Sequence, residues 1–394
     1  MDMNFSIARL PRIEFGSGAV AKLPAILSQY GRQVLIVTGS RSLQTSMHWQ
    51  ALSQLLSSAG LAWQVVAVHN EPSPELIDET VQAFRGQAFD VVLGIGGGSA
   101  LDAAKAIAGL LRPGNSVMDH LEGVGPELPY RGPATPFVAV PTTAGTGSEA
   151  TKNAVLSRHG QDGFKKSFRD DKLVAEYAVV DPDLLSNCPP GILAANGMDA
   201  FTQLIESYVS TRANPLTDAM ALSGMAAVRD SLLPWYEGTG DASTCRSRMA
   251  YAALLSGITL AQVGLGSVHG LAAPLGAFFP IPHGVACGTL LAEATRINLD
   301  AIRDREPGNS AYGRYATVGR LMTDRTLPDA EAIEALLKLL DDWTCRLNLQ
   351  RLGAYGVREG DVDHIVANSR GSSMKTNPIV LTDGEIARII RARI

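Results

Sequence analysis

The chain has 394 residues and a formal net charge of −5, and its composition is 46% hydrophobic and 19% charged. This balance is typical of a packed globular protein and argues against a disordered one. The negative net charge, without any Lys/Arg block, argues against a nucleic-acid partner.

The chain length and the lack of targeting signals bear on the number of domains and on the location of the protein. A chain of this size usually forms two domains. No stretch of about 18 apolar residues occurs, and the first fifteen residues lack a basic start followed by an apolar run. We therefore expect no membrane span and predict a cytoplasmic protein. The four cysteines form no Cys-x-x-Cys pair, so we interpret them as reduced structural thiols, with Cys287 near the candidate site.

The first half of the chain alternates short β-branched runs with amphipathic stretches. The β-branched runs are predicted strands: residues 33–38, 63–68, 90–95, 137–141 and 178–181. The amphipathic stretches are predicted helices: residues 43–59, 74–85 and 100–111. A polar, hairpin-like region lies near residues 157–165. This rhythm predicts a parallel sheet with flanking helices.

The second half of the chain has a different composition and hydrophobic pattern. Asp181-Pro182 and then Cys188-Pro189-Pro190 interrupt the pattern, and the residues that follow are rich in Ala, Leu and Met at helical spacing. We therefore predict an α/β dinucleotide-binding domain over residues 1–185. An all-helical domain that binds metal and substrate is predicted over residues 186–394.

A glycine cluster follows the strand predicted at residues 90–95. Because glycines have no side chains, the backbone here can come close to a pyrophosphate. The helix that follows attracts the pyrophosphate with its N–H groups. We predict that it binds the cofactor through Gly96, Gly97, Gly98, Ser99 and Asp102. The alternative is that the glycines only form a tight turn between strand and helix.

A second small, hydroxyl-rich loop, residues 141–149, follows the strand predicted at 137–141. Its hydroxyl groups can donate hydrogen bonds to phosphate, ribose or a carboxamide. The predicted cofactor-binding residues are Thr142, Thr143, Thr146 and Ser148. A capping box from Thr146 to Glu149 is an alternative interpretation, and both roles can hold together.

The end of the first predicted strand carries Gly39, Ser40 and Arg41. An acid at this point would accept hydrogen bonds from an adenosine 2′-hydroxyl and repel a 2′-phosphate. A glycine, a hydroxyl and a guanidinium favour NADP over NAD, although NAD is not excluded. The alternative is that Arg41 is a solvated residue at the start of a helix.

Three glycine-flanked side chains in the second half suit a divalent metal: Asp199, His269 and His283. A carboxylate and two neutral imidazoles around an open position favour a Lewis acid that acts on an oxygen. Gln203 lies four residues after Asp199, on the same helix face, where a further ligand can sit. The alternative is that each histidine is an ordinary core or surface residue.

These motifs together resemble the iron-containing alcohol dehydrogenase family over nearly the whole chain. The strongest matches are Gly-Gly-Gly-Ser-Ala-Leu-Asp-Ala-Ala-Lys at 96–105, Pro-Thr-Thr-Ala-Gly-Thr-Gly-Ser-Glu at 141–149, Gly-Met-Asp-Ala at 197–200, and His269–Gly284. Further matches are Arg12–Gly18, Leu121–Gly125 and Thr376-Asn377-Pro378.

The resemblance implies a dinucleotide-binding α/β domain, an all-α C-terminal domain of the dehydroquinate synthase-like architecture, and reversible oxidation of a small-molecule alcohol to an aldehyde or ketone. It also implies a homodimer or higher oligomer. The family's metal, Fe²⁺ or Zn²⁺, is typically held by one aspartate and three histidines. Gln203 stands at the first histidine position, and Ala273 replaces a further histidine beside the substrate.

These departures leave alternatives to the main hypothesis of a metal-dependent alcohol dehydrogenase or aldehyde reductase. Branches resembling glycerol dehydrogenase use one carboxylate and two histidines, which fits Asp199, His269 and His283 as catalytic ligands. A metal-independent reductase of an anionic oxo-acid, resembling maleylacetate reductase, is a second hypothesis. Its anion would meet residues of one loop: Arg370, Ser372, Ser373 and Lys375. A non-catalytic nucleotide-binding homologue is the third.

Overall fold

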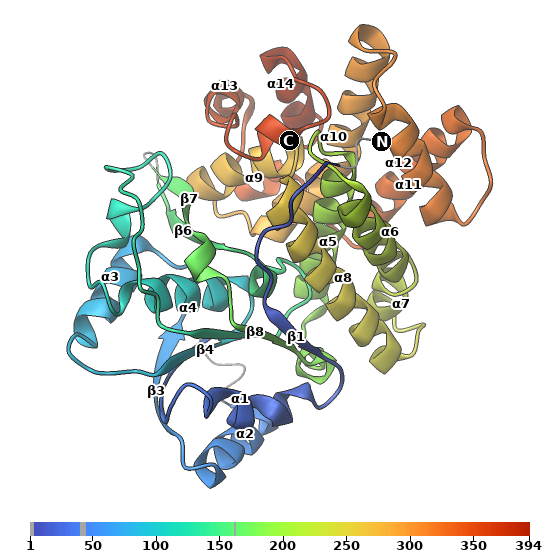
Figure 1. Ribbon diagram of the computed structural model, residues 1–394. Helices are drawn as coiled ribbons and strands as arrows, with labels where there is room; N and C mark the ends of the chain where they lie inside the picture. Colours follow the sequence, from blue (N-terminus) through green and yellow to red (C-terminus); the bar gives the residue numbers. More distant parts are fainter. Residues whose placement is uncertain (1–3, 40–44, 161–162) are drawn as a thin grey trace. The chain divides into compact units, whose positions relative to one another are not determined.

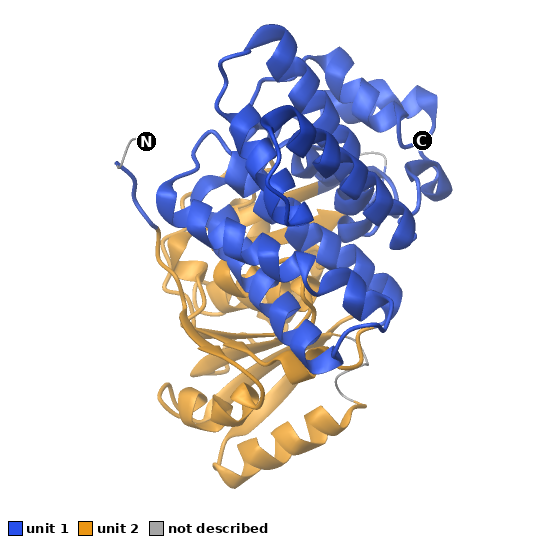
Figure 2. Ribbon diagram, turned by 90° about the vertical axis from the view of Figure 1, so that its right-hand side faces the viewer, with its two compact units in different colours: residues 1–7, 159–164, 189–394 blue, residues 8–158, 165–188 orange. Residues whose placement is uncertain are grey.

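The computed structural model describes residues 4–39, 45–160 and 163–394, and the chain divides into two compact units (Figure 2). Unit 2 comprises Ala8–Arg158 and Lys165–Cys188. Unit 1 comprises Pro189–Ile394 together with the short segments 1–7 and 159–164. Each unit is described by itself below. Gly39 is within the described residues, whereas Ser40 and Arg41 lie outside them.

Unit 2 is built on a six-stranded sheet in the order β1-β8-β5-β4-β2-β3 (Figure 1). All its neighbouring strands run parallel. The strands are β1 (Arg12–Phe15), β2 (Gln33–Gly39), β3 (Ala62–Val68), β4 (Val91–Gly96), β5 (Phe137–Pro141) and β8 (Tyr177–Val180). The predicted parallel sheet is confirmed. Strand β1, at one edge, was not among the predicted strands.

Helices cover both faces of this sheet, because its central strands are apolar on both sides. Val34, Ile36 and Leu93 share a core with α1 (Leu23–Leu27) and α2 (Met47–Ser58). Figure 1 shows α3 (Pro74–Ala83) and α4 (Gly98–Leu110) on the opposite face. The helices predicted at 74–85 and 100–111 are confirmed within a few residues.

The helix predicted at 43–59 begins only at Met47. The Ser46 side chain accepts a hydrogen bond from the Trp49 N–H at 3.3 Å, so Ser46 is the N-cap. A two-stranded sheet is formed by β6 (Asn153–Arg158) and β7 (Phe164–Arg169), which confirms the predicted hairpin-like region.

Unit 1 is a bundle of helices. Its helices are α5 (Pro190–Val209), α6 (Pro215–Arg229), α7 (Leu232–Tyr236), α8 (Ala242–Val263), α9 (Ser267–Phe278), α10 (His283–Arg305), α11 (Ala311–Thr323), α12 (Asp329–Arg346), α13 (Val362–Ala367) and α14 (Asp383–Arg391). Helix α5 is almost wholly buried and contacts α6, α8 and α10. Among the described residues no single helix is long and apolar enough to span a membrane; α8 and α9 pass such a test only as a pair bent by 100°.

Candidate active site

The predicted nucleotide loops follow the carboxyl ends of neighbouring strands in unit 2. Strands β2 and β4 are paired, and the sheet continues from β2 to β3 on one side and from β4 to β5 on the other. In open α/β sheets this change of direction is where ligands bind. Gly39 ends β2, and Gly96 ends β4. The topology therefore brings two of the predicted cofactor segments together.

The glycines of the 96–98 cluster allow close approach rather than merely turning the chain. A Cβ atom on Gly96 would lie 2.6 Å from the Ala100 Cβ and 3.3 Å from the Gly39 nitrogen. A Cβ on Gly98 would lie 2.7 Å from the Thr146 side chain, so the glycine loop and the hydroxyl-rich loop are in contact. Helix α4 starts at Gly98, with Gly97 as its N-cap. A free helix N-terminus at this point suits a pyrophosphate.

The remaining predicted cofactor residues fall into two groups. The first group is half-buried and keeps some surface for a ligand: Ser99, Thr142, Thr143 and Thr146. The second group, Asp102 and Ser148, is joined internally, because the Ser148 hydroxyl donates to Asp102 Oδ1 at 2.5 Å. The alternative capping box is wrong: Gly147 is the N-cap of the turn Ser148–Ala150, and Thr146 Oγ1 accepts from the Ser148 N–H.

Lys105 ties the two loops together from inside unit 2. Its side chain is fully buried, and its ammonium donates to Ser148 O at 2.9 Å, to Thr151 Oγ1 at 2.9 Å and to Asn153 O at 2.8 Å. Burial lowers the pKa of Lys105 to about 8, although Asp102 opposes the shift. The hydroxyl-rich loop is therefore fixed to the first turns of α4.

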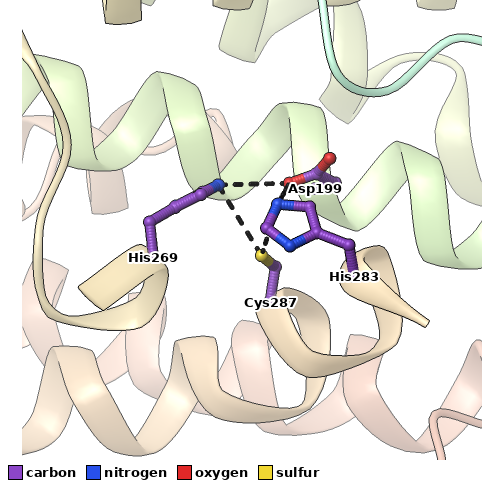
Figure 3. A group of neighbouring side chains, drawn as sticks. All are labelled: Asp199, His269, His283 and Cys287. Atoms are coloured by element: carbon purple, nitrogen blue, oxygen red, sulfur yellow. Dashed lines mark hydrogen bonds and ion pairs between the residues drawn. The ribbon is translucent and has the colours of Figure 1, made fainter. Parts of the chain in front are cut away.

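The predicted metal ligands come together in unit 1 (Figure 3). Asp199 projects from the middle of α5, His269 from the first turn of α9, and His283 is the first residue of α10. His269 Nε2 lies 3.2 Å from Asp199 Oδ1, and His283 Nε2 lies 3.8 Å from the same oxygen. The fold thus brings Asp199 next to two histidines that are 70 or more positions away in the sequence.

Cys287 is a fourth member of this cluster. Its Sγ lies 3.6 Å from His269 Nε2 and 3.7 Å from His283 Nε2. One ligand atom from each of the four side chains lies within 4.8 Å of all the others. From the sequence, Cys287 was predicted to be a structural thiol near the site. The signal was its position four residues after His283, one helical turn along α10.

Glu206 fixes the orientation of His269. Its Oε2 lies 2.6 Å from His269 Nδ1, and its Oε1 accepts the Val268 N–H at 2.7 Å. Because a carboxylate only accepts hydrogen bonds, Nδ1 carries a proton toward Glu206, and Nε2, which faces Asp199 and Cys287, is the ring nitrogen that can give up its proton to bind an ion. Carboxylates bound to the outer nitrogen of a metal-binding histidine commonly play this part. Glu206 was not among the residues predicted from the sequence.

The electrostatics of the cluster favour a positive charge. Burial opposes the ionisation of Asp199, but His283 and His269 outweigh it, and the pKa of Asp199 is lowered. Burial likewise opposes a charged His269, yet Cys287, Asp199 and Glu206 outweigh it and raise its pKa. Asp199 is 1% exposed, and its Oδ2 has no hydrogen-bond partner among the described residues. This donor set and its charge fit a divalent ion.

Gln203 lies one turn after Asp199 on α5 and is buried, as the helical spacing predicts. Its Oε1 accepts a hydrogen bond from the Ser256 hydroxyl of α8 at 2.6 Å. The amide oxygen is therefore already used by a neighbouring helix, and only its second lone pair is left for an ion. Its role as a ligand stays a prediction.

Close helix packing and the closing Thr-Asn-Pro motif hold the ligands in place. A Cβ on Gly284 would lie 2.4 Å from Ala195 O, so this glycine lets the start of α10 press against α5. Asn377 Oδ1 accepts the Ser267 N–H at 3.0 Å, and the Thr376 hydroxyl donates to Leu265 O at 2.6 Å. The motif thus braces the start of α9, which carries His269.

Comparisons with known proteins agree with this arrangement. Residues 11–182 match the family model described as iron-containing alcohol dehydrogenase. Residues 193–394 match that of the Fe-containing alcohol dehydrogenase family, C-terminal.

Individual relatives match over almost their whole length. The NAD-dependent methanol dehydrogenase of Bacillus methanolicus is 30% identical over 97% of this chain and 97% of its own. A crystal structure of 1,3-propanediol oxidoreductase is 28% identical, with a TM-score of 0.86 over 99% of this chain and 100% of that one. The sulfoacetaldehyde reductase of Bifidobacterium kashiwanohense, solved with NAD⁺, is 26% identical, with a TM-score of 0.85 over 99% of both chains. This chain belongs to the iron-containing alcohol dehydrogenase family and is a nicotinamide-dependent oxidoreductase of alcohols and aldehydes.

Proposed function

We propose an NADP(H)-linked, metal-dependent alcohol dehydrogenase or aldehyde reductase in which Asp199, His269 and His283 hold the ion. The observation that carries the proposal is the placement of Asp199 Oδ1 within 3.2 Å and 3.8 Å of the two imidazole Nε2 atoms. A bound Fe²⁺ or Zn²⁺ supplies a Lewis acid that polarises a carbonyl group, and the nicotinamide supplies the hydride.

The chain's own residues have separate tasks in this proposal. Asp199 provides the negative charge that draws a cation into a buried space. Glu206 holds His269 in the tautomer whose Nε2 is a lone-pair donor. In unit 2, the N-terminus of α4 and the hydroxyls of Thr143 and Thr146 bind the cofactor phosphates.

Removal of the metal tests this function directly. Exhaustive chelation should lower the rate of aldehyde reduction by on the order of 10²-fold or more, because loss of a Lewis acid removes several kcal/mol of stabilisation. Adding Zn²⁺ or Fe²⁺ should restore the rate, and elemental analysis should follow the activity. A chelated sample that holds no metal and still reduces aldehydes at the full rate would show that the ion has no catalytic role.

The preference for NADP rests on Gly39. No acid stands at the end of β2, and Gly39 is half-buried. The methanol dehydrogenase relative is named as NAD-dependent, so the cofactor must be inferred from this chain's own residue rather than from the family. Comparison of kcat/KM with NADPH and NADH would measure the preference.

An anionic aldehyde is a second candidate substrate. The loop that holds Ser372, Ser373 and Lys375 packs against α9, since a Cβ on Gly270, next to His269, would lie 2.9 Å from Met374. Lys375 is exposed, whereas Arg370 already pairs with Asp383 and donates to Leu381 O. The relative named sulfoacetaldehyde reductase acts on such a substrate by name. Lys375 is the cation that supports this alternative.

Lys375→Ala separates the neutral and anionic substrates. If the loop binds an anion, this change should raise KM for sulfonated or carboxylated aldehydes about two- to fivefold and leave neutral aldehydes unchanged, because an exposed charge pair contributes up to about 1 kcal/mol. Lys338→Ala, on the exposed face of α12, is the matched control. Equal effects of Lys375→Ala on both substrate types would count against the anionic substrate.

We further propose a homodimer that uses β1, and a cytoplasmic location, for which the four free thiols give support. Strand β1 is at the edge of the sheet, and Ile13 and Phe15 on one side of it are 40% and 41% exposed. Light scattering should give twice the chain mass, and Ile13→Asp should shift the mass toward the monomer. A monomeric wild-type protein at assay concentration would rule the dimer out.

A further inference from the structure

We infer that Cys287 is the fourth ligand of the ion, so that the centre is an Asp-His-His-Cys site that prefers Zn²⁺ to Fe²⁺. This inference rests on the proposed function, because it takes the ion to lie among Asp199, His269 and His283. It replaces the amide of Gln203 with a thiolate as the fourth donor.

The distances within the cluster suit a tetrahedral ion. Ions with ordinary Zn–N, Zn–O and Zn–S bond lengths set neighbouring ligand atoms about 3.3 to 3.6 Å apart. The sulfur of Cys287 lies 3.6 Å from His269 Nε2 and 3.7 Å from His283 Nε2. Asp199 Oδ1 lies 3.2 Å and 3.8 Å from the same two nitrogens. Four of the six distances between the ligand atoms are therefore close to the edges of a tetrahedron, and all four atoms lie within 4.8 Å of one another.

The backbone fixes Cys287 for this role. His283 and Cys287 are four residues apart on α10, so their side chains lie on one face of a rigid helix. Cys287 is fully buried, and its sulfur lies beside the His269 and His283 rings (Figure 3). Gln203, by contrast, is held by Ser256 from α8. The thiol is therefore better placed than the amide to complete the site.

Charge balance also favours the thiolate. A divalent ion held by one carboxylate and two neutral imidazoles keeps one positive charge at its ligands, and the Glu206 carboxylate offsets that charge only through the His269 ring. When the ion binds, the Cys287 thiol loses its proton to solvent, and the thiolate brings the centre to neutrality. Sulfur with imidazole selects zinc, whereas oxygen donors favour harder ions. Zinc sites with four protein ligands are usually closed, so a carbonyl oxygen would reach this ion as a fifth neighbour, a coordination number that zinc can adopt.

Cobalt substitution in the full-length protein tests the bond itself. Protein loaded with one equivalent of Co²⁺ should show an intense near-ultraviolet sulfur-to-cobalt charge-transfer band. Cys287→Ala should abolish the band. Cys245→Ala should keep it, because Cys245 is also buried in unit 1 but lies outside the cluster. Cys287→Ser and Cys287→Ala should weaken Zn²⁺ binding on the order of 10- to 100-fold in a competition with a chelating dye.

Thiol chemistry gives a second, activity-independent measurement. Bound Zn²⁺ should protect Cys287 from alkylation during partial denaturation, and chelation should remove the protection, while Cys245 reacts alike in both samples. Stoichiometric Co²⁺ without a sulfur band, or a Cys287→Ala variant that binds Zn²⁺ as tightly as wild type, would overturn the ligand role and leave the proposed function standing. A wild-type protein that binds neither ion would overturn both.

Discussion

Changing Asp199 to asparagine should lower kcat/KM for aldehyde reduction on the order of 10³-fold and reduce the metal content of the purified protein. The change keeps the size of the side chain but removes the negative charge that lies between two imidazoles. Without it, a divalent ion in this buried space loses its only carboxylate ligand among the cluster residues. Because such an ion contributes several kcal/mol to catalysis, its loss accounts for an effect of this size.

The measurement pairs steady-state kinetics with elemental analysis and a circular dichroism spectrum. Asp218→Asn is the matched control, since Asp218 is a buried carboxylate in unit 1 that pairs with Arg314 rather than with the cluster. It should cost stability and leave metal content near that of wild type. If Asp199→Asn retained both its metal and its activity, Asp199 could not be a ligand.

Gly39→Asp should lower kcat/KM with NADPH about 100-fold and leave kcat/KM with NADH unchanged or higher. A carboxylate at the end of β2 repels a 2′-phosphate and accepts hydrogen bonds from a ribose 2′-hydroxyl. The position has room for the change, because no described atom lies within 4 Å of a Cβ on Gly39. The variant should therefore fold normally, and its effect should be a change in cofactor preference.

Gly39→Asn separates charge from size in this experiment. It adds the same bulk without the negative charge, so it should keep most of the preference for NADPH. A wild-type enzyme that strongly prefers NADH would show that Gly39 does not set the cofactor. Equal losses with aspartate and asparagine would show that the space, not the charge, matters at this position.

Local patterns in the sequence were sufficient for the sheet and the nucleotide loops. Strands such as Gln33–Gly39 are rich in β-branched and other apolar residues, and a glycine cluster between strand and helix has few structural solutions. Element ends were less certain, because Ser46 caps α2 through a hydrogen bond that competes with the helical pattern upstream of it. The edge strand β1 has only four residues, so the alternation of Ile13 and Phe15 with Arg12 and Glu14 is too short to mark a strand.

The metal cluster was only partly visible in the sequence. Asp199, His269 and His283 stood out because glycines flank them in a segment poor in charge. Cys287 did not stand out, since a buried cysteine is more often part of the core than a ligand. Glu206 is two turns beyond Asp199 on α5, yet only the packing of α9 against α5 shows that it meets His269. The hydrogen bond from Ser256 to Gln203 joins two helices, and neither helix has a sequence pattern that predicts it.

Glu206 has a consequence for how this protein can change over evolutionary time. One of its oxygens accepts the Val268 N–H at the start of α9, and the other accepts from the His269 ring. A shorter acid, an amide or an apolar residue would fail at one or both of these tasks. A replacement therefore needs at least one further substitution, to hold the helix end or to orient the imidazole. Position 206 is thus constrained by two contacts at once, although Glu206 is not a member of the ligand cluster.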